Sequence, residues 1–232
     1  MSDELKVLSA GAVKSGVSEV AKAFERQTGT KVTIEFNTAP ELRQRMAAGD
    51  AADVVVAPPA AMEEFQKQGR IVAGTRGFVG RSRMGVVVHA DAPAPDVSSA
   101  AAFTTALAAA TAVVHNTASS GIYSAKLLEK LGLKEKLGAR IEVVNTGSAV
   151  MKTVETRGPG AVGLAQISEV MVMIDKGCRV KLAAPLPAEI QNETSYEAAA
   201  TSSSAAPDAA KQLAASLASE AAKKIFAATG IS

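Results

Sequence analysis

Two hydrophobic patterns alternate along this chain. Short apolar runs, such as Val54–Ala57, are typical of buried strands, and each is followed by a stretch in which apolar residues recur every three or four positions. After Ser9 the recurring residues that would share one helical face are Val13, Val17, Val20, Ala21 and Phe24. This succession predicts an α/β protein with mostly parallel sheets that carry helices on both faces. The last predicted helix covers Pro207–Ala228.

Four times, a predicted strand runs through a turn of small residues into a predicted helix. These turns follow the strand that ends near Ser9, the strand at 33–36, the strand Ala112–His115 and the strand Ile141–Val144. A turn of this kind presents backbone N–H groups and the positive end of a helix dipole at the carboxyl end of the strand, where an anion can bind. The sequence therefore predicts four openings that suit an anion.

Two further strands, near 84–89 and near 193–201, are candidates for crossings between two lobes. This predicts one lobe from residues 1–82 plus 193–232 and a second lobe from residues 83–192. Ligands of open α/β sheets bind beyond the carboxyl ends of the strands. A cleft between the two lobes is therefore expected to gather the four turns around one bound molecule.

Composition narrows the classes of ligand. The 232 residues include 25 basic and 23 acidic side chains, which are interspersed, so no nucleic-acid-binding surface is predicted. Aromatic residues make up 3% of the chain and Trp is absent, which argues against the binding of bases or sugars on aromatic faces. A monomer with a small polar ligand is expected.

Metal, cofactor and membrane functions find no support in the sequence. Cys178 is the single cysteine, and His89 and His115 have no cysteine partner, so neither a disulfide nor a transition-metal site is predicted. No phosphate-binding glycine motif occurs, no cofactor is expected, and no run of about 20 apolar residues could span a membrane. The start of the chain lacks a signal-peptide pattern. This predicts a cytoplasmic protein if Met1 is the native start and a periplasmic one if an export signal has been removed.

The segments KVLSAGAVKSG, FNTAPELRQRMAAGDAADVVVAPP, SSGIYSAKLLEKLG and VGLAQISE follow one another in an order that resembles a known family. The chain is similar over nearly its whole length to the molybdate-binding proteins of ABC transporters, and more broadly to type 2 periplasmic binding proteins. The resemblance implies two α/β lobes joined by two crossing strands, a ligand cleft between the lobes, a small anionic ligand and an ABC permease as partner.

The binding turns depart from the pattern of that family. Molybdate binders of this type offer a serine in each of the first two turns, and these places fall on Ala12 and Ala39; a tyrosine of theirs is matched by Gln166. Since each hydrogen bond to an anion contributes about 1.5–3 kcal/mol, the losses predict weak molybdate binding. Lys14 and Arg43 could supply charge for a carboxylate instead.

The resulting prediction is a small-anion binding protein of the ABC-transporter type that favours a carboxylate. Its predicted ligand-binding residues lie at the four turns or at strand ends beside them: Gly11, Ala12, Val13, Lys14, Thr38, Ala39, Pro58, Asn116, Ser119, Ser120, Gly121, Gly147, Ser148 and Gln166. For the serines of the third turn, ordinary capping of the following helix is the alternative interpretation.

An enzymatic function stays open beside the receptor function. This branch of the family is also similar to aconitate isomerase, which moves a double bond in a tricarboxylate by removing and returning a proton. For that chemistry the proton carriers that lie near the turns are Lys14, His115 and Tyr123. A packed core position is the alternative interpretation for the histidine and the tyrosine, and a solvated surface lysine is the alternative for Lys14.

Overall fold

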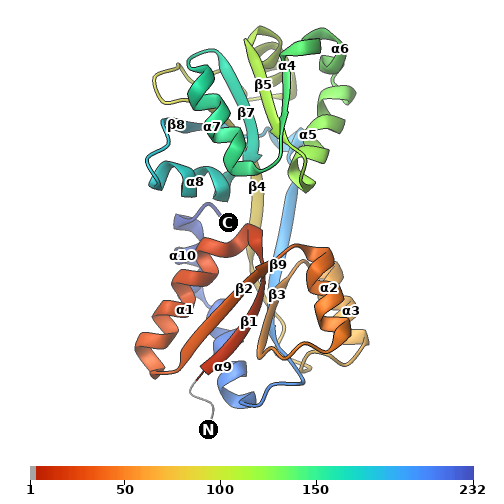
Figure 1. Cartoon of the computed structure of the whole chain (residues 1–232), viewed down its shortest axis with the longest axis vertical. Helices are drawn as coiled ribbons and strands as arrows, with labels where there is room; N and C mark the ends of the chain where they lie inside the picture. Colours follow the sequence, from red (N-terminus) through yellow and green to blue (C-terminus); the bar gives the residue numbers. More distant parts are fainter. Residues whose placement is uncertain (1–3) are drawn as a thin grey trace. The chain divides into compact units, whose positions relative to one another are not determined.

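The computed structural model describes residues 4–232, which form two compact units (Figure 1). Of the described residues, 4–82 and Thr194–Ser232 form unit 1, and Arg83–Glu193 form unit 2. Two neighbouring strands, β4 (Gly77–His89) and β9 (Glu193–Ala200), have residues in both units. Strand β4 begins well before the expected position near residue 84, because the polar residues Arg81, Ser82 and Arg83 hide its first half from an apolar pattern.

Unit 1 is built on strands in the order β2-β1-β3-β9. Strand β1 pairs in parallel with both β2 and β3, and β9 runs antiparallel to β3. The elements in this unit besides β4 and β9 are β1 (Glu4–Ala10), the 3-10 helix η1 (Gly11–Val13), α1 (Lys14–Thr28), β2 (Lys31–Asn37), α2 (Ala39–Ala48), β3 (Val54–Ala57), α3 (Pro59–Lys67), α9 (Pro207–Leu217) and α10 (Glu220–Ala228).

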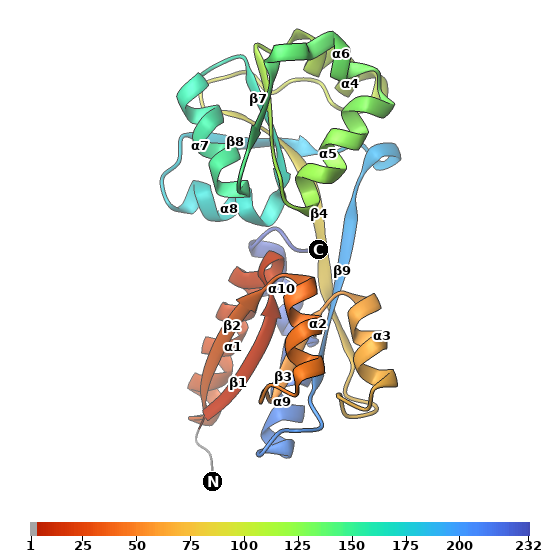
Figure 2. The ribbon, with the colours of Figure 1, turned by 45° about the vertical axis from the view of Figure 1, so that its right-hand side comes forward.

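Helices cover the two faces of this sheet (Figure 2). Helix α1 packs against α9 and α10, and α2 packs against α3. The apolar residues predicted for α1, from Val13 to Phe24, are all buried, as expected from their spacing. Gly16 allows α10 to approach α1 closely, because a Cβ at this position would overlap the ring of Phe226.

The C-terminal helix is divided, contrary to the uninterrupted helix expected over Pro207–Ala228. Helix α9 ends at Leu217, and α10 starts after Ser219, whose Oγ accepts a hydrogen bond from the N–H of Ala222 at 3.1 Å. Ser219 therefore acts as an N-cap in the middle of the expected helix. An alanine-rich pattern on both sides hides this boundary in the sequence.

Unit 2 contains the strand order β4-β7-β5-β6, and β8 pairs with the other edge of β4. Strand β5 is parallel to β6 and β7, whereas β4 is antiparallel to β7 and β8. The elements are α4 (Ala100–Ala109), β5 (Ala112–Asn116), α5 (Ser119–Lys130), α6 (Leu133–Leu137), η2 (Gly138–Arg140), β6 (Ile141–Val144), α7 (Gly147–Arg157), β7 (Ala161–Gln166), α8 (Ile167–Asp175), β8 (Val180–Pro185) and η3 (Ala188–Ile190).

The unit 2 sheet separates two hydrophobic cores. Successive residues of a strand point to opposite faces, so Val113 belongs to the core under α4, α5 and α6, and Val114 belongs to the core under α7 and α8. Val86 and Val87 on β4 divide in the same way. The strands are therefore apolar on both faces, which is why their sequences read as continuous apolar runs.

Candidate functional site

The three parallel strands of unit 1 end side by side. Ala10 at the end of β1 pairs with Asn37 at the end of β2, and Ser9 pairs with Val56 near the end of β3. The loops that follow these strands therefore start from one edge of the sheet. This edge collects the predicted residues of the first half of the chain: Gly11, Ala12, Val13, Lys14, Thr38, Ala39 and Pro58.

The first of these turns begins α1 without a side-chain cap. Neither Ala10 nor Val13, which precede η1 and α1, caps the helix with its side chain. The Val13 side chain is buried, so only its backbone can face a ligand. Lys14 is exposed, and its Nζ lies 5.4 Å from the centre of the Phe36 ring, a cation–π contact. This turn offers backbone groups together with a positioned ammonium group.

The second turn is capped by its own side chains. Thr38 Oγ1 accepts a hydrogen bond from the N–H of Glu41 at 3.4 Å, and Glu41 Oε2 accepts from the N–H and the hydroxyl of Thr38 at 2.6 and 2.8 Å. The pKa of Glu41 is lowered, chiefly by the backbone hydrogen bond from Thr38. This capping box occupies the positive end of α2 with a carboxylate and engages the Thr38 hydroxyl proton.

Arg43, which the sequence suggested as a partner for a carboxylate ligand, already has an acidic partner. Its Nε lies 2.8 Å from Oε2 of Glu64 on α3. Both side chains are partly exposed, so the pair is an ordinary surface ion pair. In this arrangement Lys14 is the cation placed at the edge of the unit 1 sheet by its position in the first turn.

The third and fourth turns start from paired strands in unit 2. Asn116 at the end of β5 pairs with Val144 at the end of β6, and the N–H of Thr117 donates to the Val144 carbonyl at 2.9 Å. Gln166 ends β7, the parallel neighbour of β5 on its other side, and is 9% exposed. This edge collects the remaining predicted residues: Asn116, Ser119, Ser120, Gly121, Gly147, Ser148 and Gln166.

Asn116 holds the third turn together from within. Its side-chain Oδ1 accepts hydrogen bonds from the N–H groups of Ala118 at 2.9 Å and Gly121 at 3.1 Å, and its Nδ2 donates to Ser120 Oγ at 3.2 Å. A Cβ on Gly121 would overlap the Asn116 carbonyl oxygen, so glycine is required for this close approach. Asn116 thus uses two of the N–H groups at the start of α5, while Ser119 stays exposed.

Two of the three predicted proton carriers lie in packed surroundings. His115 is 5% exposed, and its Nδ1 lies 3.0 Å from the Asn116 carbonyl oxygen. Tyr123 donates its hydroxyl hydrogen to the Ile190 carbonyl at 2.8 Å, and burial raises its pKa. A phenol in this state is a poor base at neutral pH, whereas Lys14 is exposed.

The fourth turn contains a carboxyl group that the sequence prediction left outside the site. Thr146 Oγ1 accepts a hydrogen bond from the N–H of Ala149 at 3.2 Å and caps α7. Gly147, the first residue of α7, is buried, and a Cβ on it would overlap the carboxyl group of Glu169. Burial raises the pKa of Glu169, the third residue of α8. The sequence places this glutamate three residues after the end of β7, which is a weak signal for a side chain that returns to the sheet edge.

Residues 4–232 provide neither a metal-binding cluster nor a membrane-spanning helix. No group of three His, Cys, Asp or Glu side chains in that range could hold a metal ion. Its helices include none that is long and apolar enough to cross a membrane. Burial and a hydrogen bond to Glu155 raise the pKa of the Cys178 thiol to about 11, so this cysteine is unreactive as a nucleophile at neutral pH.

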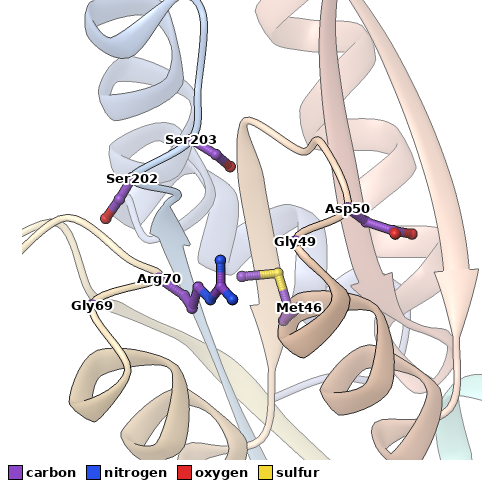
Figure 3. A pocket seen from close by; sticks show the side chains of 7 residues that line it. All are labelled: Met46, Gly49, Asp50, Gly69, Arg70, Ser202 and Ser203. Carbon is purple, nitrogen blue, oxygen red and sulfur yellow. The ribbon is translucent and has the colours of Figure 1, made fainter.

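Unit 1 also has a pocket of about 190 Å³ away from the turns (Figure 3). It lies near the start of β3, at the opposite edge of the unit 1 sheet, and its lining residues are Met46, Gly49, Asp50, Gly69, Arg70, Ser202 and Ser203. The Arg70 guanidinium and the Met46 side chain point toward one another, whereas Asp50 points away and pairs with Arg45 at 2.6 Å. Arg70 donates to the Ala47 carbonyl at 3.1 Å, so it ties the loop after α3 to the last turn of α2.

The fold agrees with that of known proteins. The model of a family of bacterial extracellular solute-binding proteins matches residues 5–232, and the chain belongs to this family. An aconitate isomerase from a Pseudomonas species is 29% identical over 233 aligned positions, which cover 98% of this chain and 87% of that protein.

Two solved structures share the architecture. One, described as the substrate-binding domain of a molybdenum ABC transporter from Clostridium difficile, has a TM-score of 0.80 and 19% identity over 98% of this chain and 97% of that chain. The periplasmic molybdate-binding protein of Azotobacter vinelandii has a TM-score of 0.73 and 21% identity over 98% of both chains. The fold is therefore the type 2 periplasmic-binding-protein fold, which agrees with membership of the family of bacterial extracellular solute-binding proteins.

Proposed function

We propose that this solute-binding protein binds a small anion through the turns at the carboxyl edges of its parallel strands. The observation that carries the proposal is the uncapped start of α1, which presents Lys14 beside the ends of β2 and β3. An uncapped helix start attracts negative charge, and a cation next to it strengthens that attraction. An ABC permease is the protein partner expected for such a receptor.

The ligand we propose is a carboxylate rather than molybdate. Ala12 and Ala39 stand where the resemblance to molybdate binders calls for serine hydroxyls, and Thr38 donates its hydroxyl hydrogen to Glu41. An oxyanion that depends on hydroxyl donors would therefore be held poorly at the first two turns. The aconitate isomerase that resembles this chain is named for a tricarboxylate, which supports the carboxylate preference.

Calorimetric titration with molybdate, tungstate, citrate, cis-aconitate and trans-aconitate tests this proposal. We expect a carboxylate to bind at least tenfold more tightly than molybdate. A tenfold difference in Kd corresponds to about 1.4 kcal/mol of binding free energy, and the loss of one hydrogen bond to an anion costs at least that much. Lys14→Ala should weaken binding, and Lys22→Ala on the same helix is the matched control, since Lys22 pairs with Glu19 on the exposed surface. Sub-micromolar molybdate affinity would overturn the carboxylate preference.

An isomerase is the second candidate function, and the 29% identity to aconitate isomerase over 98% of the chain favours it. Incubation with trans-aconitate in deuterated water should then interconvert the isomers and exchange a substrate hydrogen. Lys14→Met should slow that exchange at least about 100-fold, the lower range for a positioned acid or base. Tyr123→Phe should have a smaller effect, because the Tyr123 hydroxyl hydrogen is already donated to Ile190.

The two candidate functions give different results in these experiments. Tight carboxylate binding without isomerisation or hydrogen exchange supports the receptor function and contradicts the isomerase function. If the Lys14→Met variant still exchanges the substrate hydrogen at the parent rate, Lys14 is not the proton carrier. A His115→Gln variant needs a melting curve beside its kinetics, because His115 is 5% exposed and its loss can disturb packing.

A further inference from the structure

The cavity of about 190 Å³ in unit 1 is enclosed by three separate segments (Figure 3). They are the end of α2 with the residues after it, the loop that follows α3 and the loop that follows β9. Hydrogen bonds join these segments to one another. The N–H of Ser202 donates to the Arg70 carbonyl at 2.9 Å, and the Arg70 guanidinium donates to the Ala47 carbonyl at 3.1 Å. The walls of the cavity are therefore held in place by the protein's own contacts.

Arg70 gives this cavity a positive charge that no acidic group neutralises. Within residues 4–232 it forms no salt bridge, and its guanidinium makes one hydrogen bond, from Nη2 to Ala47. A guanidinium has five N–H donors in a planar fork, so most of them stay available for an acceptor. Asp50 also lines the cavity, but its carboxylate points away and lies 2.6 Å from Nε of Arg45. The cavity therefore favours a negatively charged ligand.

The other lining groups combine an apolar wall with a hydroxyl group. The Met46 side chain is 4% exposed and points toward the Arg70 guanidinium (Figure 3). Gly49 leaves the space beside the guanidinium open, because a Cβ at this position would lie 3.7 Å from Nη1 of Arg70. Ser203 Oγ donates to Thr201 Oγ1 at 3.4 Å, a long hydrogen bond that rotation of the hydroxyl can exchange for one to a ligand.

This combination suits a small carboxylate with a short apolar end. A carboxylate accepts two parallel hydrogen bonds from a guanidinium, and a carbon chain can pack on the thioether of Met46. A fully polar oxyanion would leave the Met46 wall without an apolar contact. Since a water molecule takes up about 30 Å³ in the liquid, the cavity has room for roughly six non-hydrogen atoms, which is the size of butanoate. Arg70 is exposed, so such a ligand can enter from solvent.

We infer that this cavity is a second ligand-binding site, which binds a short-chain monocarboxylate between Arg70 and Met46. Arg70 holds the carboxylate, Ser203 donates a hydrogen bond to it, and Met46 contacts the carbon chain. The cavity lies at the edge of the unit 1 sheet opposite to the turn that carries Lys14. The inference therefore does not depend on the anion proposed for the turns. A ligand at this site stabilises unit 1, because it binds the folded form of three segments.

NMR titration of the protein with sodium butanoate tests the site. We expect saturable shifts, with a Kd in the millimolar range or below, of the Met46 methyl signal and of the backbone N–H signals of Gly69, Arg70 and Ser203. Butylammonium has the same chain and should cause no such shifts, because Arg70 repels its charge. Sulfate at equal ionic strength should bind at least about tenfold more weakly, because it buries no CH₂ groups on Met46.

Arg70→Gln should weaken butanoate binding at least about tenfold, because hydrogen bonds from a charged donor are lost. Arg70→Lys should weaken it as well, since lysine keeps the charge but lacks the planar fork. Arg26→Gln is the matched control, because Arg26 is an exposed arginine of the same unit that does not line the cavity. This variant and Lys14→Ala should bind butanoate as the parent protein does. Butanoate should also raise the Tm of the parent but not that of Arg70→Gln.

Absence of shifts at Met46 and Arg70 in the parent protein, or an unchanged affinity in Arg70→Gln, overturns the inference. Sulfate binding as tight as butanoate binding overturns the preference for a monocarboxylate. Butanoate shifts that disappear in Lys14→Ala would place the ligand at the first turn and also overturn the inference. Failure of the proposed function is a separate result, since it appears as a lack of trans-aconitate and molybdate binding. The shifts of the parent protein decide the question even if Arg70→Gln does not fold.

Discussion

Glu41 and Glu169 hold the same position in their helices and differ in almost everything else. Each is the third residue of a helix that follows a strand at a sheet edge, α2 in unit 1 and α8 in unit 2. Glu41 is exposed and closes a capping box with Thr38, which lowers its pKa. Glu169 faces Gly147 of another helix, and burial raises its pKa.

The difference shows that a helix start does not by itself define an anion site. At α2 the positive end of the dipole already binds a carboxylate of the same turn. At α7 the nearby carboxyl group belongs to a different helix and can change its charge or move. The chain therefore has turns of the same sequence pattern that differ in their side-chain partners, and these partners decide how much positive charge each helix start presents.

The largest expected effect concerns the contact between Gly147 and Glu169. Gly147→Ala should destabilise the parent protein by about 1–2 kcal/mol, because the new methyl group forces the carboxyl group out of its position. In a Glu169→Ala background the same change should be neutral or slightly stabilising, since alanine restricts the unfolded chain. Urea unfolding of the four proteins gives the coupling free energy, which we expect to be about 1–2 kcal/mol.

Gly11→Ala serves as the control for this cycle. A Cβ on Gly11 would have no atom within 4 Å, and its φ is not in the left-handed region. Its effect should be small and independent of Glu169. If Gly147→Ala lowers the free energy of unfolding equally in both backgrounds, the Glu169 side chain does not contact the start of α7.

A smaller effect is expected for the N-cap of α2, where Thr38 and Glu41 form the capping box. Thr38→Ala should cost about 1 kcal/mol, because the N–H of Glu41 loses its acceptor at the start of α2. Ser219→Ala at the start of α10 removes a similar N-cap and gives a reference value. At α10 no glutamate side chain completes a capping box. Guanidinium unfolding measures both. A Thr38→Ala variant as stable as the parent would contradict the capping box at α2.

Much of the fold could be predicted because hydrophobic spacing governs strand and helix type. The face of α1 and the buried runs of β3 and β5 follow this rule and are confirmed. Ile122 on α5 departs from this rule, since its apolar side chain is 54% exposed. The division between α9 and α10 was missed because Ser219 lies in a stretch whose alanine-rich pattern continues on both sides.

The turns could be located from the sequence, but their hydrogen bonds could not. The sequence places Asn116 directly after a strand, yet only the folded turn shows that its side chain binds the N–H groups of Ala118 and Gly121. The contact between Gly147 and Glu169 joins two helices that are separated by β7 in the chain. No local pattern encodes such a contact, because it depends on how the helices pack on the sheet.

The smallest expected effects are pH dependences of opposite sign. The folded protein favours ionised Glu41, so its contribution to stability is present above the ordinary pKa of 4.5 and is lost as the pH falls through the lowered value. It favours neutral Glu169, whose contribution is complete below 4.5 and is lost as the pH rises through the raised value. Melting curves from pH 3 to pH 8 should therefore show that Glu41→Gln is less stable than the parent at neutral pH, with a gap that closes in acid. Glu169→Gln should gain relative to the parent as the pH rises above 4.5. Two variants with the same pH trend would show that the two glutamates share one environment after all.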